Sequence, residues 1–184
     1  MDSTLHIFDF DDTLIDSEAE IRISHKDGSN SVLSSDEYAK YTTKPGDIFD
    51  FTDFDSYPKK LQIIEPVFSE LRAAVQSSGI DNVVILTARS NPVPVQIFLK
   101  ENKIPNIEVI AVGTSSPQAK ALYILDRVKN ENFSEVVVFE DNVRNIRRIR
   151  KVLTDTGIKL QTNRVKNGAI VDTINERRYT GRNK

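Results

Sequence analysis

The sequence predicts an α/β fold in which a Rossmann-like parallel sheet of about five strands is flanked by helices, with a small insertion after the first strand. Short β-branched runs recur along the 184-residue chain, and each is apolar almost throughout rather than at alternate positions. Continuous apolar runs are typical of parallel strands that are covered on both faces. Helical patterns separate the runs, and strand–helix alternation of this kind favours a parallel sheet.

The expected strands follow one another at regular intervals, and the fifth is weaker than the others and is expected at an edge of the sheet. They are Leu5–Phe8, Val83–Leu86, Ile107–Val112, Val136–Phe139 and Ile158–Thr162. Because the ligands of such sheets bind beyond the carboxyl ends of the strands, the residues that follow these runs are the first candidates for chemistry.

Four helices are expected between the strands. The first begins at Pro66, which suits a first helical turn, and ends at Gly79. The second covers Pro92–Asn102, with Val93 and Ile97 facing inward. The inward residues of the other two are Ala121, Leu125 and Val128 after Pro117, and Val143, Ile146, Ile149 and Leu153 after Asp141.

Residues 18–60 interrupt the alternation and are expected to form a small cap over the strand ends rather than a second full domain. The turn dipeptide Asp27-Gly28, between two short strand-like runs, predicts a β-hairpin. Ser34 followed by Glu37 resembles a capping box, which predicts a short helix after it.

An acidic, aromatic stretch at residues 47–55 completes the insertion. The expected domain organisation is therefore an α/β core over residues 1–164, which carries the cap at about 18–60. Residues 165–184 have little apolar periodicity and are expected to form a basic, loosely held tail.

The composition is that of a soluble globular protein, with 39% hydrophobic and 28% charged residues. Cysteine is absent, which excludes disulfides, thiolate catalysis and cysteine-bound zinc. The two histidines, His6 and His25, are too few for a histidine-rich metal site and are expected to be structural or exposed. No apolar stretch approaches the roughly 20 residues that span a membrane, so no membrane association is expected and a cytoplasmic location is the default.

The charge is unevenly distributed along the chain. Residues 1–141 hold 13 basic and 24 acidic residues, whereas residues 142–184 hold 12 and 3. The fourth helix contributes a basic face formed by Arg144, Arg147, Arg148 and Lys151. Such a face predicts either an ordinary solvated helix surface or a surface that binds nucleic acid.

Three acids in four positions, Asp9, Asp11 and Asp12, directly follow the first apolar run. Like charges held close together raise one another's pKa, so this cluster is costly unless positive charge offsets it. A hard divalent cation with oxygen ligands removes the repulsion, and magnesium is the usual candidate. The alternative is a solvated turn in which the carboxylates accept hydrogen bonds from backbone amides.

Four motifs, in order along residues 4–162, resemble those of the haloacid dehalogenase (HAD) superfamily. They are Asp9, Asp11 and Thr13 after the first strand, Val83–Thr87 as a strand that ends in Thr, Lys120 near the start of a later helix, and Glu140 and Asp141 after the fourth strand. The short insertion and the basic fourth helix give a looser similarity to the phosphatase modules of polynucleotide end-repair enzymes.

The resemblance implies that this chain is a magnesium-dependent phosphatase. Asp9 would attack phosphorus to form an aspartyl-phosphate, and Asp11 would act as general acid and then as general base. Thr87 would donate a hydrogen bond to a phosphoryl oxygen, and Lys120 would neutralise charge on the phosphoryl oxygens and on Asp9. Mg²⁺ would be held by the Asp9 carboxylate, the Asp11 backbone carbonyl and Asp141.

Several roles remain open at this level. Arg89 either binds substrate phosphate or pairs with a neighbouring acid, and Lys129 competes with Lys120 for the role of the motif lysine. Glu140 either binds the metal as a second ligand or contacts the metal ligands from the outer shell. Asp12 stands where many members of the superfamily carry Gly, which adds negative charge. Asn145 stands where many carry Asp, which leaves the outer metal shell undefined.

Three functional hypotheses follow. The first is a phosphatase that acts on a phosphorylated small molecule such as a nucleotide or a sugar phosphate. The second is a nucleic-acid 3′-end phosphatase that uses the basic face, whose binding would depend strongly on salt. The third is a non-catalytic interaction module, against which the intact acids Asp9, Asp11 and Asp141 argue.

Overall fold

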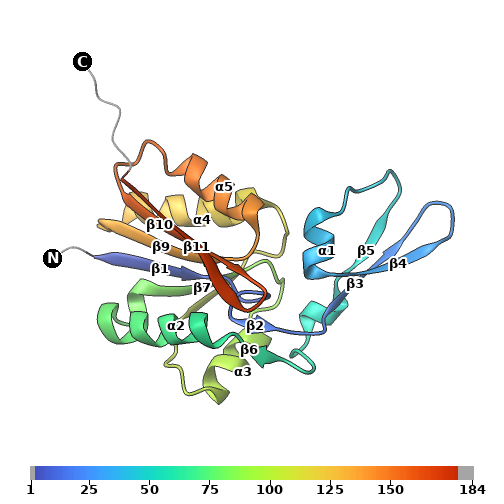
Figure 1. Ribbon diagram of the computed structural model, residues 1–184, viewed down its shortest axis with the longest axis horizontal. Helices are drawn as coiled ribbons and strands as arrows, with labels where there is room; N and C mark the ends of the chain where they lie inside the picture. Colours follow the sequence, from blue (N-terminus) through green and yellow to red (C-terminus); the bar gives the residue numbers. More distant parts are fainter. Residues whose placement is uncertain (1–2, 178–184) are drawn as a thin grey trace.

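A computed structural model describes residues 3–177 of the chain, in which a central six-stranded sheet has the order β11-β10-β9-β1-β7-β8 (Figure 1). Neighbouring strands from β10 to β8 are parallel, and β11 is antiparallel to β10. The fold is therefore the Rossmann-like α/β class that the sequence predicts. The strands of this sheet are β1 (Thr4–Phe8), β7 (Val83–Thr87), β8 (Glu108–Ala111), β9 (Glu135–Glu140), β10 (Lys159–Lys166) and β11 (Ala169–Arg177).

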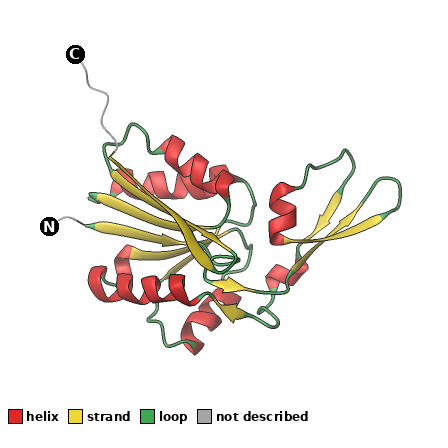
Figure 2. Ribbon diagram, in the orientation of Figure 1, coloured by secondary structure: helices red, strands yellow, loops and turns green. Residues whose placement is uncertain are grey.

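Helices cover both faces of the sheet (Figure 2). One face packs against α2 (Glu65–Ser78) and α3 (Val93–Glu101), and the other against α4 (Pro117–Asn130) and α5 (Val143–Val152). In β1, Leu5 and Ile7 join the core under α4 and α5, whereas Phe8 joins the core under α2 and α3. Burial on both faces explains why the strand runs are apolar without alternation.

The expected orientation of the second helix is wrong. Val93 and Ile97 of α3 are 49% and 42% exposed, and the buried stripe consists instead of Pro94, Val95, Phe98 and Leu99. The ring of Phe98 packs edge-on against the rings of Phe10 and Phe68. Burial of this large ring outweighs that of one Val and one Ile, and it fixes which face turns inward.

The prediction of a loosely held tail is also wrong for residues 165–177. Residues 159–166 and 169–177 form a β-hairpin, so β10 is an inner strand and β11 is the edge. Asn167 and Gly168 have φ angles of 50° and 74°, the left-handed pair that a tight hairpin turn requires. Residues 178–184, the rest of the expected tail, lie outside the described residues.

The insertion forms a separate lobe beside the strand ends, seen at the right of Figure 1. Its antiparallel sheet has the order β4-β3-β5, and the hairpin and the Ser34–Glu37 capping box lie where the sequence predicts them. A two-stranded neck, β2 paired with β6, joins the lobe to the core. The elements are β2 (Ile15–Asp16), β3 (Glu20–Ser24), β4 (Asn30–Ser34), α1 (Ser35–Lys40), β5 (Ile48–Asp50), the 3₁₀ helix η1 (Thr52–Asp55) and β6 (Gln62–Ile63).

Strand order determines where chemistry can occur. The chain proceeds from β1 to β7 and β8 on one side and then returns to β9 on the other side, so the order reverses at β1. The carboxyl ends of β9, β1 and β7 meet at this reversal, which is the usual ligand site of such sheets. Within residues 3–177, no helix is long and apolar enough to cross a membrane.

Candidate active site

A cavity of about 710 Å³ lies between the strand ends and the cap lobe. Its core side is formed by the loops that follow β1, β7, β8 and β9 and by the first turns of α4 and α5. Its cap side is formed by α1, β5 and η1. The residues that carry the argument below are Asp9, Asp11, Asp12, Tyr38, Tyr41, Phe49, Phe51, Phe54, Arg89, Lys120, Glu140, Asp141, Asn142, Arg144 and Asn145.

Asp9 lies at the floor of the cavity, directly after β1. Its backbone amide donates to the carbonyl of Phe139 at 3.0 Å, which continues the β1–β9 ladder and fixes the position of the Cα. Its side chain is only 8% exposed. Burial, together with the negative charge of Glu140, raises the pKa of the Asp9 carboxyl, although Lys120 opposes this effect.

Lys120 supplies the counter-charge at this floor. Its Nζ lies 2.6 Å from Asp9 Oδ1 and 2.9 Å from Glu140 Oε2, and the side chain is almost fully buried. Burial alone would lower the pKa of Lys120, but the two carboxylates outweigh it and raise the pKa above its ordinary value. Lys120 is therefore a permanent cation beside Asp9, whereas the competing Lys129 is exposed at the other end of α4.

Thr13 and Asp141 complete the environment of Asp9. The buried hydroxyl of Thr13 lies 3.2 Å from Asp9 Oδ2 and 3.4 Å from Asp141 Oδ1, and it accepts from the Asp141 backbone amide at 3.2 Å. One threonine thus joins the end of β1 to the end of β9. Burial, followed by the charges of Glu140 and Asp9, raises the pKa of Asp141 well above its ordinary value.

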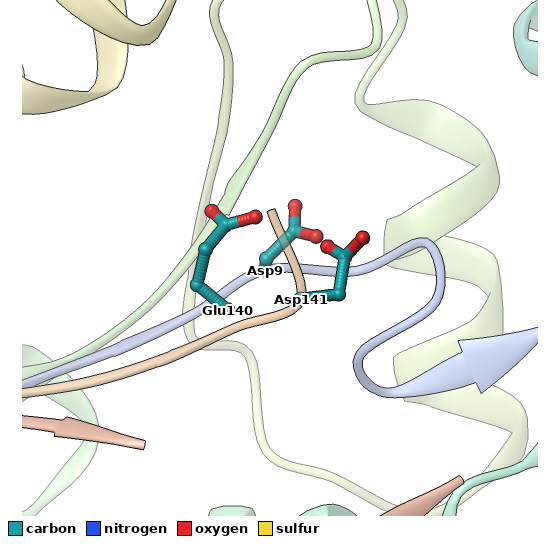
Figure 3. A group of neighbouring side chains, drawn as sticks. All are labelled: Asp9, Glu140 and Asp141. Carbon is teal, nitrogen blue, oxygen red and sulfur yellow. The ribbon is translucent and has the colours of Figure 1, made fainter. Parts of the chain in front are cut away.

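Three carboxylates converge at this point. Oxygen atoms of Asp9, Glu140 and Asp141 all lie within 4.8 Å of one another, and Figure 3 shows the three side chains pointing to the same side of the strand ends. The expected metal ligands included Asp9 and Asp141, and Glu140 joins them in this cluster. The carboxylate of Asp11 is not a member of it.

Asp11 is instead paired with Arg89. The guanidinium donates to both carboxylate oxygens, from Nε at 2.8 Å and from Nη2 at 2.7 Å. Burial raises the pKa of Asp11, and this effect exceeds the opposite effect of Arg89. The third nitrogen of Arg89 donates to the carbonyls of Phe54 and Ser56 in the cap, so this side chain joins the core to the cap.

The turn after β1 explains why the acids face the cavity. The carbonyl of Phe10 accepts from the amides of Leu14 and Ile15, while the Phe10 ring packs into the core under α3. Asp12 takes the left-handed conformation with a φ of 59° that this tight turn requires. Burial, and then the charges of Asp11, Asp9 and Asp16, raise the pKa of Asp12 to about 7.

Thr87 is less accessible than the sequence suggests. It ends β7 as expected, but it is 1% exposed and is not among the residues that line the cavity. Its hydroxyl accepts from the backbone amide of Arg89 at 3.2 Å. The structure therefore brings Asp9, Asp11, Arg89, Lys120 and Asp141 to the cavity and holds Thr87 just behind it.

The charges lining the cavity do not balance. Seven acidic residues line it against three basic ones, Arg89, Lys120 and Arg144. Buried carboxylates without counter-charge are unfavourable, which is the physical cause of the raised pKa values. A divalent cation with oxygen ligands fits this donor set, because the cluster presents carboxylate oxygens and an excess of negative charge.

The basic face of α5 reaches the cavity at one end only. Arg144 lines the cavity, and Asn142 caps the helix by accepting from the Arg144 amide. Arg147 and Lys151 are exposed on the outer surface, and Arg148 is partly buried and donates to Gln118. Asn145 is buried and lines the cavity.

The two histidines lie away from the cavity. His6 Nε2 is 3.0 Å from Ser78 Oγ at the end of α2. His25 lies in the cap, where its ring nitrogens contact Asp47 at 2.7 Å and Ser31 at 2.8 Å. Both therefore have structural partners, as the sequence suggested.

Two features of the site were missed. Glu140 was recognised as a candidate, but its direct contact with Lys120 was not, because residues twenty positions apart carry no signal of mutual contact. The sequence shows that the cap is rich in aromatic residues, but it does not show where they lie. Their position opposite Asp9, Asp11, Asp12, Glu140 and Asp141, which we call the acidic floor, depends on how the cap folds back onto the core.

Comparison with protein-family models, with curated proteins and with solved structures finds no match to this chain.

Proposed function

We propose that this protein is a magnesium-dependent phosphatase that hydrolyses a phosphate monoester through an aspartyl-phosphate on Asp9. The observation that carries the proposal is the position of the Asp9 carboxylate. It is held between Lys120 and Thr13 at the floor of a cavity whose other acids leave an excess of negative charge. The resemblance of the four motifs to the HAD superfamily supports the same chemistry.

Asp9 is suited to act as a nucleophile because it is oriented before substrate arrives. Lys120 and Thr13 each hold one of its two oxygens, which limits rotation of the carboxylate. In the first step an Asp9 oxygen bonds to phosphorus as the bond to the leaving oxygen breaks. Lys120 lies close enough to stabilise the charge that develops on the phosphoryl oxygens.

Asp11 is the candidate acid and base, and its ion pair with Arg89 gives it a defined starting position. A phosphoryl group offers Arg89 a second bidentate partner, so substrate competes with Asp11 for the guanidinium. Once released from Arg89, the Asp11 carboxylate, whose pKa is raised by burial, takes up a proton from solvent and donates it to the leaving oxygen. In the second step the Asp11 carboxylate takes a proton from water, the water oxygen bonds to phosphorus, and the bond to Asp9 breaks.

The carboxylates of Asp9, Asp141 and Glu140 are the candidate ligands of Mg²⁺, with the Asp11 carbonyl as the ligand that the resemblance adds. When bound, Mg²⁺ offsets the excess negative charge and allows an anionic nucleophile to approach an anionic phosphate. Thr13, which contacts Asp9 and Asp141, orients both carboxylates toward one point.

A panel of phosphate monoesters tests the proposal. Wild-type protein is expected to release inorganic phosphate when Mg²⁺ is present and to stop when a chelator removes it. Asp9→Asn is expected to abolish release while circular dichroism shows an unchanged fold. Asp16→Asn, at an exposed acid a few residues along the same segment, is the matched control and should retain activity.

Two results would count against the proposal. Activity of Asp9→Asn near that of the wild type would remove Asp9 from the mechanism. Absence of release across the whole panel would favour the alternative, an interaction module without turnover.

A further inference from the structure

The cap side of the cavity carries four aromatic rings, Tyr38, Tyr41, Phe49 and Phe51, which we call the aromatic wall. Tyr38 meets Phe49 and Phe51 edge-on at centroid distances of 5.5 and 5.4 Å, and Phe49 and Phe51 lie 6.1 Å apart. All four line the cavity, and Phe51 is 40% exposed. Tyr38, Tyr41 and Phe49 are partly buried, and a group of rings that lines a cavity in this way can form a binding surface.

Contacts between cap and core fix the aromatic wall opposite the acidic floor. The Tyr38 hydroxyl lies 3.4 Å from Ser115 Oγ in the loop after β8. Arg89 donates to the Phe54 carbonyl at 2.7 Å, and Ser90 donates to Asp55 at 2.6 Å. The two surfaces therefore face one cavity, and one ligand can contact both.

The cavity is larger than a phosphate ester of a small alcohol requires. Its volume of about 710 Å³ lies in the range of pockets that enclose whole organic ligands. Polar groups also line the cavity, and they include the hydroxyls of Ser35, Thr43 and Thr52 on the cap side and the amide of Asn142 on the core side. Such a lining suits a flat ring with hydrogen-bonding edges and a hydroxylated linker.

We propose that the leaving group of the substrate is a nucleoside, whose base stacks on the aromatic wall while its phosphate lies against Asp9. This inference rests on the proposed function and names its substrate class. Bases stack on aromatic side chains because every base presents a π-face. Arg144, which lines the cavity at the start of the basic face, is positioned for a further phosphate group.

A phosphotyrosine peptide is the competing aromatic ester. It brings one small ring with a single hydroxyl-derived oxygen, and it therefore offers fewer hydrogen-bonding groups than a nucleoside does to the hydroxyls and the amide that line the cavity. Acidic residues such as Asp50 and Asp55 also line this side of the cavity and disfavour the acidic segments that often flank such sites. The nucleoside is therefore the better match.

Comparison of substrates on the wild-type protein is the first test. The kcat/KM for nucleoside monophosphates is expected to exceed that for ribose 5-phosphate by about 5- to 150-fold, the effect of one stacked base. Oligonucleotides with a terminal phosphate form a parallel arm. A preference for mononucleotides assigns the site to free nucleotides, a preference for oligonucleotides assigns it to strand ends, and either result supports the inference.

Variants of the aromatic wall form the second test. Phe51→Ala should lower kcat/KM for a nucleoside monophosphate about tenfold and leave that for ribose 5-phosphate unchanged. Phe51→Trp should restore the nucleotide rate because it keeps a stacking surface. Ile48→Ala is the matched control, since Ile48 lies in β5, the strand that directly precedes Phe51, is 71% exposed and is not among the residues that line the cavity.

Equal kcat/KM for nucleoside monophosphates and ribose 5-phosphate would overturn the inference and leave the phosphatase proposal intact. So would a higher kcat/KM for a phosphotyrosine peptide, or an equal loss for both substrates in Phe51→Ala. Calorimetry with Asp9→Asn separates binding from turnover. Tighter binding of a nucleoside monophosphate than of ribose 5-phosphate supports the inference even if the wild type releases no phosphate.

Discussion

The charge of Asp12 offers a quantitative test of the electrostatics of the acidic floor, because Asn can replace Asp at this position without a change of backbone. Asp12 has a φ of 59°, and Asn tolerates this left-handed region as well as Asp does. The Asp12→Asn variant therefore removes one partly buried acidic group at nearly constant size and shape.

The magnitude follows from the pKa of Asp12, which burial and the charges of Asp11, Asp9 and Asp16 raise from 3.8 to about 7. A carboxyl whose pKa is raised on folding binds its proton more tightly in the folded state. The favourable contribution of this protonated carboxyl to the free energy of unfolding is complete below the unfolded pKa, and it is lost as the pH rises through the folded pKa. Relative to a carboxyl whose pKa does not change on folding, Asp12 then costs on the order of 2 kcal/mol at pH 5, where it is protonated in the folded state, and on the order of 4 kcal/mol at pH 8, where it is ionised.

The assay is denaturant unfolding followed by circular dichroism in the presence of a chelator, for wild type and Asp12→Asn between pH 5 and pH 8. Asp12→Asn is expected to be the more stable protein, and its advantage should widen by roughly 2 kcal/mol from pH 5 to pH 8. Asp16→Asn, at an exposed acid of the same segment, should give a much smaller change. Parallel stability curves for wild type and Asp12→Asn would refute the reasoning.

Three further variants test the contacts around the cavity and in the sheet. Lys120→Met should lower the free energy of unfolding by about 3–5 kcal/mol at neutral pH, because it leaves Asp9 and Glu140 buried without a cation. The control Lys129→Met should change it by less than about 0.5 kcal/mol. Equal losses for the two variants in denaturant titrations would contradict this reasoning. Arg89→Lys should lower kcat/KM for phosphate release about tenfold or more, since lysine cannot form the bidentate contact, and wild-type rates would exclude that role. Gly168→Ala should lower the free energy of unfolding by about 1 kcal/mol, because Gly168 has a φ of 74°, and an unchanged thermal midpoint would argue against a strained turn there.

The fold class could be predicted because burial on both faces leaves a clear pattern in the sequence. The runs that become β1, β7, β8 and β9 differ from the observed strands only by one or two residues at their ends. The carboxyl ends of these strands then had to meet near one another, whatever the details of packing. For this reason the candidate acids could be assigned to one site before the structure was known.

The errors arose where a local pattern was weak or ambiguous. Strand β11 was missed because it is an edge strand with mostly exposed residues, although Asn167-Gly168 is a hairpin signal that could have revealed it. Helix α3 carries apolar residues on two faces, and the packing of Phe98 against Phe10 determines which of these faces is buried.

Pairing within the site could be predicted only in part, since the resemblance implies the contact of Lys120 with Asp9 but no other pair. The partner of Arg89 depends on where the cap and the β1 loop fold, and the sequence left substrate and acid as equal alternatives. The structure brings Arg89 to Asp11. Likewise, Glu140 and Lys120 belong to different elements, and their contact follows from how α4 packs on the sheet.

The most direct test of the central claim is to detect the phosphoryl group on Asp9. The Asp11→Asn variant, supplied with p-nitrophenyl phosphate and Mg²⁺, should accumulate the intermediate, because this leaving group needs no proton while breakdown needs a base. Borohydride reduces an acyl phosphate to an alcohol, so peptide mass spectrometry should find the Asp9 side chain converted to homoserine only when substrate was present. Release of p-nitrophenol with Asp9 unmodified, or modification at another carboxylate, would contradict the account.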